Sequence, residues 1–141
     1  MTDRLTVLEQ IENDVRNNLT SANDYNHTPA EVKRGIHKWD DFIVKPVVCF
    51  TMTSDFPADE QAYGEDVRWM TLIFIIYAQT DGKGGTDQIF EMVEDIENFL
   101  QNTTHFTYSN QTLIGDIEVK EGGSSDPINT ALISIQVLYE S

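Results

Sequence analysis

Residues 67–79 read Val-Arg-Trp-Met-Thr-Leu-Ile-Phe-Ile-Ile-Tyr-Ala-Gln, and this stretch decides the fold. It is rich in β-branched and aromatic residues, which is typical of a β-strand. Side chains alternate between the two faces of a strand, so Trp69 and Ile73 lie on one face and Met70 and Leu72 on the other. Because both faces are apolar, we predict a central strand that is covered from both sides.

Other stretches read as strands that could flank it. Residues 42–53 are also apolar, but Pro46 has no backbone N–H, so we predict that this strand lies at an edge or carries a bulge there. Residues 113–119 and 130–139 form two further candidates, and the second of them alternates clearly between apolar and polar positions. A short strand or a turn is expected at residues 32–36.

Two stretches have helical periodicity. Residues 3–22 place apolar side chains at steps of three and four, and Thr2 or Asp3 can cap the start. Residues 86–100 form the second helix, with Thr86 as its cap. The apolar positions expected to be buried in the first helix are Leu5, Val7, Leu8, Ile11, Val15 and Leu19.

The element order is helix, two strands, helix, two strands. This order predicts an α+β fold: a mostly antiparallel sheet of about four to five strands, with two helices packed on one face. The chain has 141 residues without a linker or repeat, so residues 1–141 are expected to form a single domain.

Acidic residues dominate the charge. Nine Lys and Arg stand against 24 Asp and Glu, which gives a formal net charge of −15 and a pI of about 4.2. This charge disfavours binding to the outside of a DNA duplex and to an anionic membrane surface. The start of the chain is charged and lacks the apolar core of a signal peptide, so we expect a protein made in a cytoplasm and not attached to a membrane.

Nothing in the sequence matches a known catalytic, cofactor or metal motif. The glycine loop at residues 80–86 lacks the spacing of a phosphate-binding loop, and its lysine and glycine stand where a calcium loop needs oxygen ligands. The histidines, His27, His37 and His105, form no closely spaced pair. Cys49 is alone on an apolar strand, where a buried, inert thiol is expected.

Carboxylates recur at four-residue steps on the second helix, at Asp87, Glu91 and Asp95. Such pairs can serve acid–base chemistry or bind a divalent cation, but on the polar face of a surface helix we expect them to be solvated. We therefore predict no enzyme, no cofactor and no metal site.

Four of the nine basic residues lie in one short segment, residues 33–45. The segment is either a solvated loop or a contact for an acidic neighbour, such as another copy of this chain. An aromatic residue lies within it, and loop aromatics serve either local packing or protein interfaces. The candidate subunit interface is Lys33, Arg34, Lys38, Trp39 and Lys45.

The whole-chain pattern resembles a known family. It combines Arg34-Gly-Ile36, the strand Pro46-Val-Val-Cys-Phe50, the strand Leu72–Ala78, the helix end Val93–Leu100 and the closing strand Ala131–Tyr139. In the order and lengths of these elements, residues 3–139 resemble the tail terminator proteins, also called tail completion or tail-to-head joining proteins, of long-tailed bacteriophages.

The resemblance implies a function in assembly. Such proteins form a ring, usually a hexamer, that caps the tail tube, stops its growth and provides the docking surface for the head connector protein. The expected partners are thus further copies of the chain, the tail tube protein and the connector, with DNA passing through unbound. The expected location is the virion tail, assembled in the host cytoplasm, and neither cofactor nor catalysis is implied.

Two loops are the expected docking elements for tube or connector: the acidic loop at residues 54–66 and the glycine loop at residues 80–86. Two other functions stay open. The chain could be another tail or neck subunit, such as a tube component, or, in a different class, an acidic inhibitor that mimics DNA. The candidate docking residues are Asp55, Asp59, Glu60, Tyr63, Glu65, Asp81 and Lys83.

Overall fold

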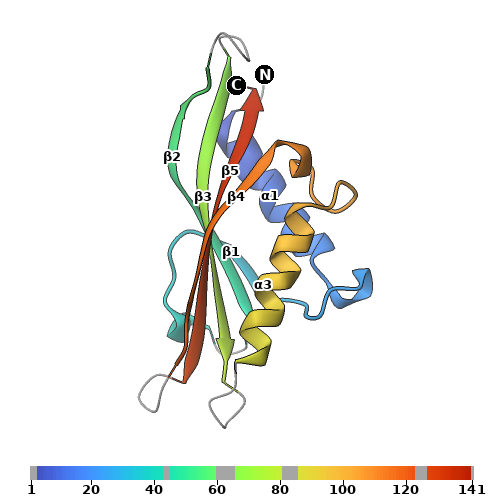
Figure 1. Cartoon of the computed structure of the whole chain (residues 1–141), viewed down its shortest axis with the longest axis vertical. Coiled ribbons are helices and arrows are strands. Elements are labelled where there is room, and N and C mark those ends of the chain that lie inside the picture. Colours follow the sequence, from blue (N-terminus) through green and yellow to red (C-terminus); the bar gives the residue numbers. More distant parts are fainter. Residues whose placement is uncertain (1–2, 43–44, 60–65, 81–85, 123–126, 141) are drawn as a thin grey trace.

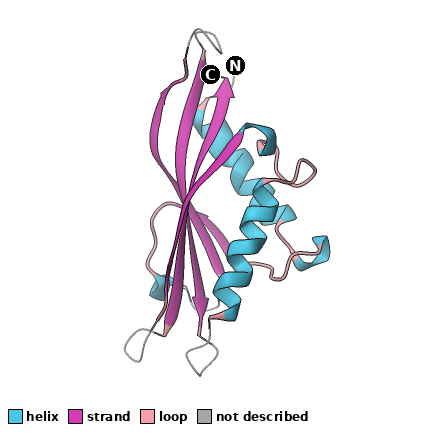
Figure 2. Cartoon of the chain, viewed as in Figure 1, coloured by secondary structure: helices cyan, strands magenta, loops and turns pink. Residues whose placement is uncertain are grey.

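The computed structural model describes residues 3–42, 45–59, 66–80, 86–122 and 127–140. Two α-helices lie on one side of a strongly twisted five-stranded sheet (Figure 1, Figure 2), which confirms the predicted α+β fold. The strand order is β1-β2-β3-β5-β4; β1 and β2 are parallel, and the other neighbours are antiparallel. The elements are α1 (Arg4–Asn18), η1 (Ser21–Asn23), β1 (Glu31–Arg34), η2 (Trp39–Asp41), β2 (Val47–Pro57), β3 (Val67–Gln79), α3 (Asp87–Leu100), η3 (Ser109–Gln111), β4 (Thr112–Lys120) and β5 (Ile128–Glu140).

Strand β3 is the central strand, as its two apolar faces predicted. It pairs with β2 on one side and with β5 along its full length on the other. Met70, Leu72 and Phe74 are fully buried on the face toward the helices. The other face of the sheet, which we call the open face, carries Ile73 and Ile75.

Strand β2 differs from the prediction. It begins at Val47, just after the cis peptide bond between Lys45 and Pro46, and it runs on to Pro57. The expectation that Pro46 marks a sheet edge or a bulge is wrong. Strand β1 pairs with β2 from the outside, and the Ala30 amide donates to the Pro46 carbonyl oxygen at 2.7 Å. The irregularity in β2 instead lies between Met52 and Ser54.

The main core lies between the sheet and the two helices. Helix α1 starts on its predicted cap, since the Thr6 amide donates to the Asp3 carboxylate at 2.8 Å. Its buried stripe runs through Val7 and not Leu5, which is 55% exposed. Val7, Ile11, Val15 and Leu19 are fully buried and Leu8 is partly buried against the core, so the predicted stripe is confirmed except at Leu5. The buried apolar residues of the helices are Val7, Ile11, Val15, Ile89, Met92, Val93, Ile96, Phe99 and Leu100.

A smaller core covers one end of the open face. Phe42 packs there against Val47, Cys49 and Ile75, under the segment that contains η2, on the opposite side of the sheet from the helices (Figure 1). The Tyr77 hydroxyl anchors this segment by donating to the His37 carbonyl oxygen at 2.5 Å. No helix in the described part of the chain is long and apolar enough to cross a membrane.

Candidate functional site

The predicted subunit interface lies along the outer edge of the sheet. Lys33 and Arg34 are the last residues of the edge strand β1, and Lys38 immediately precedes η2; all three are exposed. Arg34, however, already pairs within its own chain, because its Nε lies 3.1 Å from an Oε of Glu12 on α1. Lys33 and Lys38 are therefore the better candidates for contact with a neighbour.

The other two predicted interface residues serve the fold. The Lys45 ammonium donates to the Phe42 carbonyl oxygen at 2.6 Å and lies 5.6 Å from the centre of the Trp39 ring. Both side chains are only partly exposed. This cation–π contact holds the segment that covers the smaller core, so the aromatic residue here meets its own chain.

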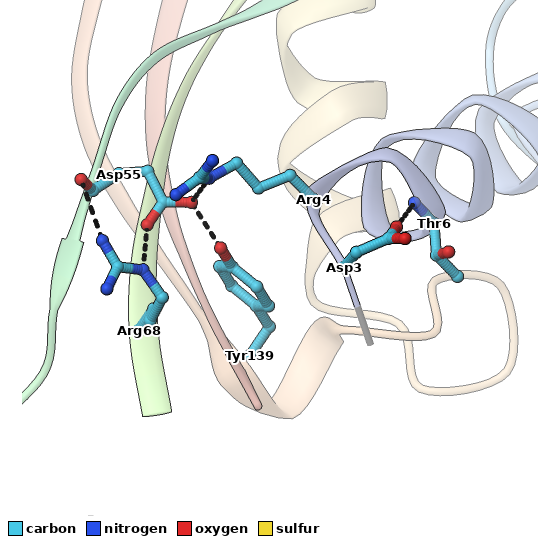
Figure 3. Close-up of polar contacts among 6 residues, drawn as sticks. All are labelled: Asp3, Arg4, Thr6, Asp55, Arg68 and Tyr139. Carbon is cyan, nitrogen blue, oxygen red and sulfur yellow. Dashed lines mark hydrogen bonds and ion pairs between the residues drawn. The ribbon is translucent and has the colours of Figure 1, made fainter. Parts of the chain in front are cut away.

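Asp55 is not a docking-loop residue, contrary to the prediction. It lies in β2, and its side chain is only 5% exposed. Figure 3 shows its carboxylate between Arg4 of α1, Arg68 of β3 and Tyr139 of β5. The Nε atoms of Arg68 and Arg4 lie 2.5 and 2.6 Å from its two oxygens, and the Tyr139 hydroxyl also donates to it. The carboxylate thus joins the first helix to three strands.

The electrostatics of this cluster favour the charged carboxylate. Burial raises the pKa of the Asp55 carboxyl, but the hydrogen bonds from Tyr139, Arg68 and Arg4 outweigh it, so the pKa lies below its ordinary value. Burial and the adjacent carboxylate raise the pKa of Tyr139, so its hydroxyl keeps the proton that it donates. The cluster stabilises the fold and uses both oxygens of Asp55 within the chain.

The remaining predicted docking residues are placed only in part. Asp59 is exposed just beyond the end of β2. Glu60, Tyr63, Glu65, Asp81 and Lys83 lie outside the described residues.

Two further aspartates are buried hydrogen-bond acceptors, which the sequence did not predict. Asp95 of α3 is 2% exposed and accepts from the Asn26 and His27 amides at 2.8 and 3.0 Å, so the expectation of a solvated carboxylate is wrong there. Asp14 of α1 accepts from the Thr107 amide at 2.8 Å. Each fixes a connecting loop that is distant in sequence, because its carboxylate accepts from backbone amides of that loop.

Cys49 is fully buried, as predicted. Burial, with a smaller effect of the nearby Glu31 and Asp41 carboxylates, raises the pKa of its thiol to about 11. The thiol is therefore protonated and unreactive at neutral pH. Within the described ranges, no group of three His, Cys, Asp or Glu side chains could hold a metal ion.

The opposite edge of the sheet carries a feature that the sequence did not reveal. Strand β4 has a bulge between Ile114 and Ile117, and a hollow of about 360 Å³ lies beside it. We call it the bulge hollow. Leu113, Gly115 and Asp116 of β4 line it together with residues of β3 and β5. Leu113 is 57% exposed.

No protein-family model matches the chain, and no curated protein matches it.

Proposed function

We propose that this chain is a tail terminator of a long-tailed bacteriophage. Copies of it would form a closed ring, six in the family that it resembles, that caps the tail tube and stops its polymerisation. The exposed face of the ring would receive the head connector, and DNA would pass through the lumen without specific contacts. The role is structural, in the virion tail, and needs no cofactor.

The observation that carries the proposal is the difference between the two lateral edges of the sheet. The β1 edge presents the exposed ammonium groups of Lys33 and Lys38. The β4 edge presents the exposed Leu113 and the carboxylates of Asp116 and Glu118. Two different lateral surfaces on one subunit are what a head-to-tail contact requires, and such contacts close into rings when the rotation between copies permits.

The net charge supports the passage of DNA. Each copy carries a formal charge of −15, so a ring would surround the duplex with a strongly negative field. Phosphate groups are repelled by such a lumen, while a cationic lumen would bind them and slow the DNA. Three of the acidic side chains do not contribute to the charge of the surface in this way, because Asp14, Asp55 and Asp95 accept hydrogen bonds within the fold.

Native mass spectrometry of the purified protein, with sedimentation at several concentrations, tests the proposal. We expect one closed species of about six 16.0 kDa subunits that does not grow at higher concentration. Long tubes formed by the protein alone would point to a tube subunit instead. A stable monomer or dimer that binds a basic nucleic-acid enzyme tightly would point to a DNA mimic, and either result would contradict the terminator.

A further inference from the structure

The two apolar cores of the molecule lie on opposite faces of the sheet. The main core joins the sheet to both helices, whereas the smaller core consists of Phe42, Val47, Cys49 and Ile75 on the open face. The smaller core is covered by the connection between β1 and β2, in which we call residues 36–42 the strap (Figure 2). Lifting the strap would uncover the smaller core and leave the contacts between the sheet and the helices in place.

Few contacts attach the strap to the sheet. Among residues 36–42, all of which the structure describes, only Phe42 is buried. His37 supplies the polar attachment, because its carbonyl oxygen accepts from the Tyr77 hydroxyl at 2.5 Å and its Nε2 lies 3.1 Å from the Arg34 carbonyl oxygen. One apolar side chain and one histidine therefore carry most of the attachment.

The other polar contacts described for the strap lie within the connection itself. The Lys38 amide donates to the Asp41 carboxylate at 2.9 Å. The Lys45 ammonium, which belongs to the same connection, donates to the Phe42 carbonyl oxygen and lies over the Trp39 ring. These contacts hold the shape of the connection without tying it to the sheet, so they can persist when the strap lifts.

Both ends of the connection are fixed to the sheet. At its start the Gly35 amide donates to the Phe50 carbonyl oxygen at 2.8 Å, and at its end the Pro46 carbonyl oxygen accepts from the Ala30 amide at 2.7 Å. Glycine has the greatest backbone freedom of any residue, so Gly35 can serve as a hinge between β1 and the strap. The strap can thus move without a change in the pairing of β1 with β2.

We infer that the strap is a hinged cover that opens as a unit while the sheet and both helices stay folded. A segment held by one buried side chain and few hydrogen bonds opens at a lower free energy than a core with many buried residues. Opening also displaces Lys38 and Trp39, two of the residues predicted to contact a neighbour, and it does not depend on the proposed ring. The apolar surface that it uncovers consists of Val47, Cys49 and Ile75, next to the partly buried Ile73, Tyr77 and Leu132.

Cys49 provides a built-in measure of the opening. It is fully buried in the smaller core and is the single cysteine of the chain, so a small methanethiosulfonate reagent can reach it only in an open or unfolded molecule. The labelling rate divided by that of the unfolded chain gives the opening constant when closing is fast. We expect this constant to exceed the unfolding constant from urea titration by about tenfold, and to change little with urea below the unfolding transition.

Three variants separate strap opening from global unfolding. Phe42→Leu weakens the packing of the strap and should speed labelling about tenfold. Tyr77→Phe removes the hydroxyl that binds His37 and should speed labelling about threefold. Ile96→Val is the control, because Ile96 is fully buried in the main core on the helix side of the sheet. It should raise the unfolding constant but label at the wild-type rate, and circular dichroism shows whether each variant is folded.

The result that would overturn the hinged cover is an opening constant equal to the unfolding constant, with the same dependence on urea. Labelling of Ile96→Val that rises in step with its loss of stability would overturn it too, since Cys49 would then be reached by global unfolding. Labelling of Phe42→Leu at the wild-type rate would show that the strap does not control access. None of these results decides the ring, which native mass spectrometry tests separately.

Discussion

The Asp55 cluster offers a sharp test of how the fold is held together. The Asp55→Ala variant removes the carboxylate that joins α1, β2, β3 and β5, and it leaves two guanidinium groups and a buried Tyr139 hydroxyl without their acceptor. Removing one partner of a buried, hydrogen-bonded ion pair costs about 3–5 kcal/mol, because the remaining polar groups stay desolvated.

The exposure of the two arginines places the expected cost at the lower end of this range. The Arg4 side chain is 55% exposed and that of Arg68 26%, so both can regain water when the carboxylate is lost. We therefore expect a loss of about 3 kcal/mol in the free energy of unfolding at pH 7. For a chain of this length, that corresponds to a fall in Tm of about 10 °C.

The effect has a defined pH dependence. The folded-state pKa of Asp55 lies below that of the unfolded chain, about 3.9, so its contribution is complete above that pH. It is lost as the pH falls through the folded-state pKa, since the carboxylate is then protonated in both states. The difference in unfolding free energy between wild type and Asp55→Ala should be constant from about pH 7 to 5 and shrink below about pH 4.

Urea unfolding followed by circular dichroism at several pH values measures this difference. The control is Glu9→Ala, which removes the same charge from an exposed position of α1 and should change stability by less than about 0.5 kcal/mol. A loss below about 1 kcal/mol for Asp55→Ala at pH 7, or a difference that grows at acid pH, would refute the account of the cluster.

Three further predictions concern the fold around the site. Cys49 should not react with a thiol reagent at pH 8 in the native protein and should react fully in denaturant, because its thiol is buried with a pKa of about 11; rapid native labelling would contradict this. Asp95→Ala should cost about 3 kcal/mol and speed amide exchange at Asn26, whereas the exposed Glu94→Ala should do neither; equal exchange in the two variants would count against the buried acceptor. Gly35→Ala should lower stability by about 1–2 kcal/mol in thermal unfolding, because φ is +101°, and an unchanged Tm would show that this turn is not strained.

The long helices and strands could be predicted from the sequence because their apolar residues recur at a regular spacing. The bounds of β3 follow from thirteen residues with apolar side chains on both faces, and α3 follows from its periodicity. The short β1 was expected as a strand or a turn, but its parallel pairing with β2 was not, since four residues carry no signal for a partner. Leu5 of α1 was wrongly expected to be buried, because it fits the same helical spacing as the buried positions and nothing local decides how far the buried face extends.

The polar part of the site could be predicted only in part. Lys33 and Lys38 are exposed, as a basic contact requires, but the partners of Asp55 and Asp95 are far away in sequence. Asp55 and Tyr139 are 84 residues apart, and Asp95 and Asn26 are 69 apart. A carboxylate in a polar stretch of sequence is predicted to be solvated, because the sequence does not show that the fold brings distant hydrogen-bond donors to it. The bulge hollow likewise depends on the register of β4 against β5, which no sequence pattern encodes.

Electron microscopy of tail tubes grown from a phage tail tube protein, with and without this protein, is the most direct test of the proposed terminator function. We expect tubes that stop growing on addition of the protein and carry one ring at one end, while the Lys33→Glu/Lys38→Glu variant leaves the tubes growing. Tubes that elongate unchanged in the presence of the wild-type protein, or that incorporate it along their length, would contradict the account.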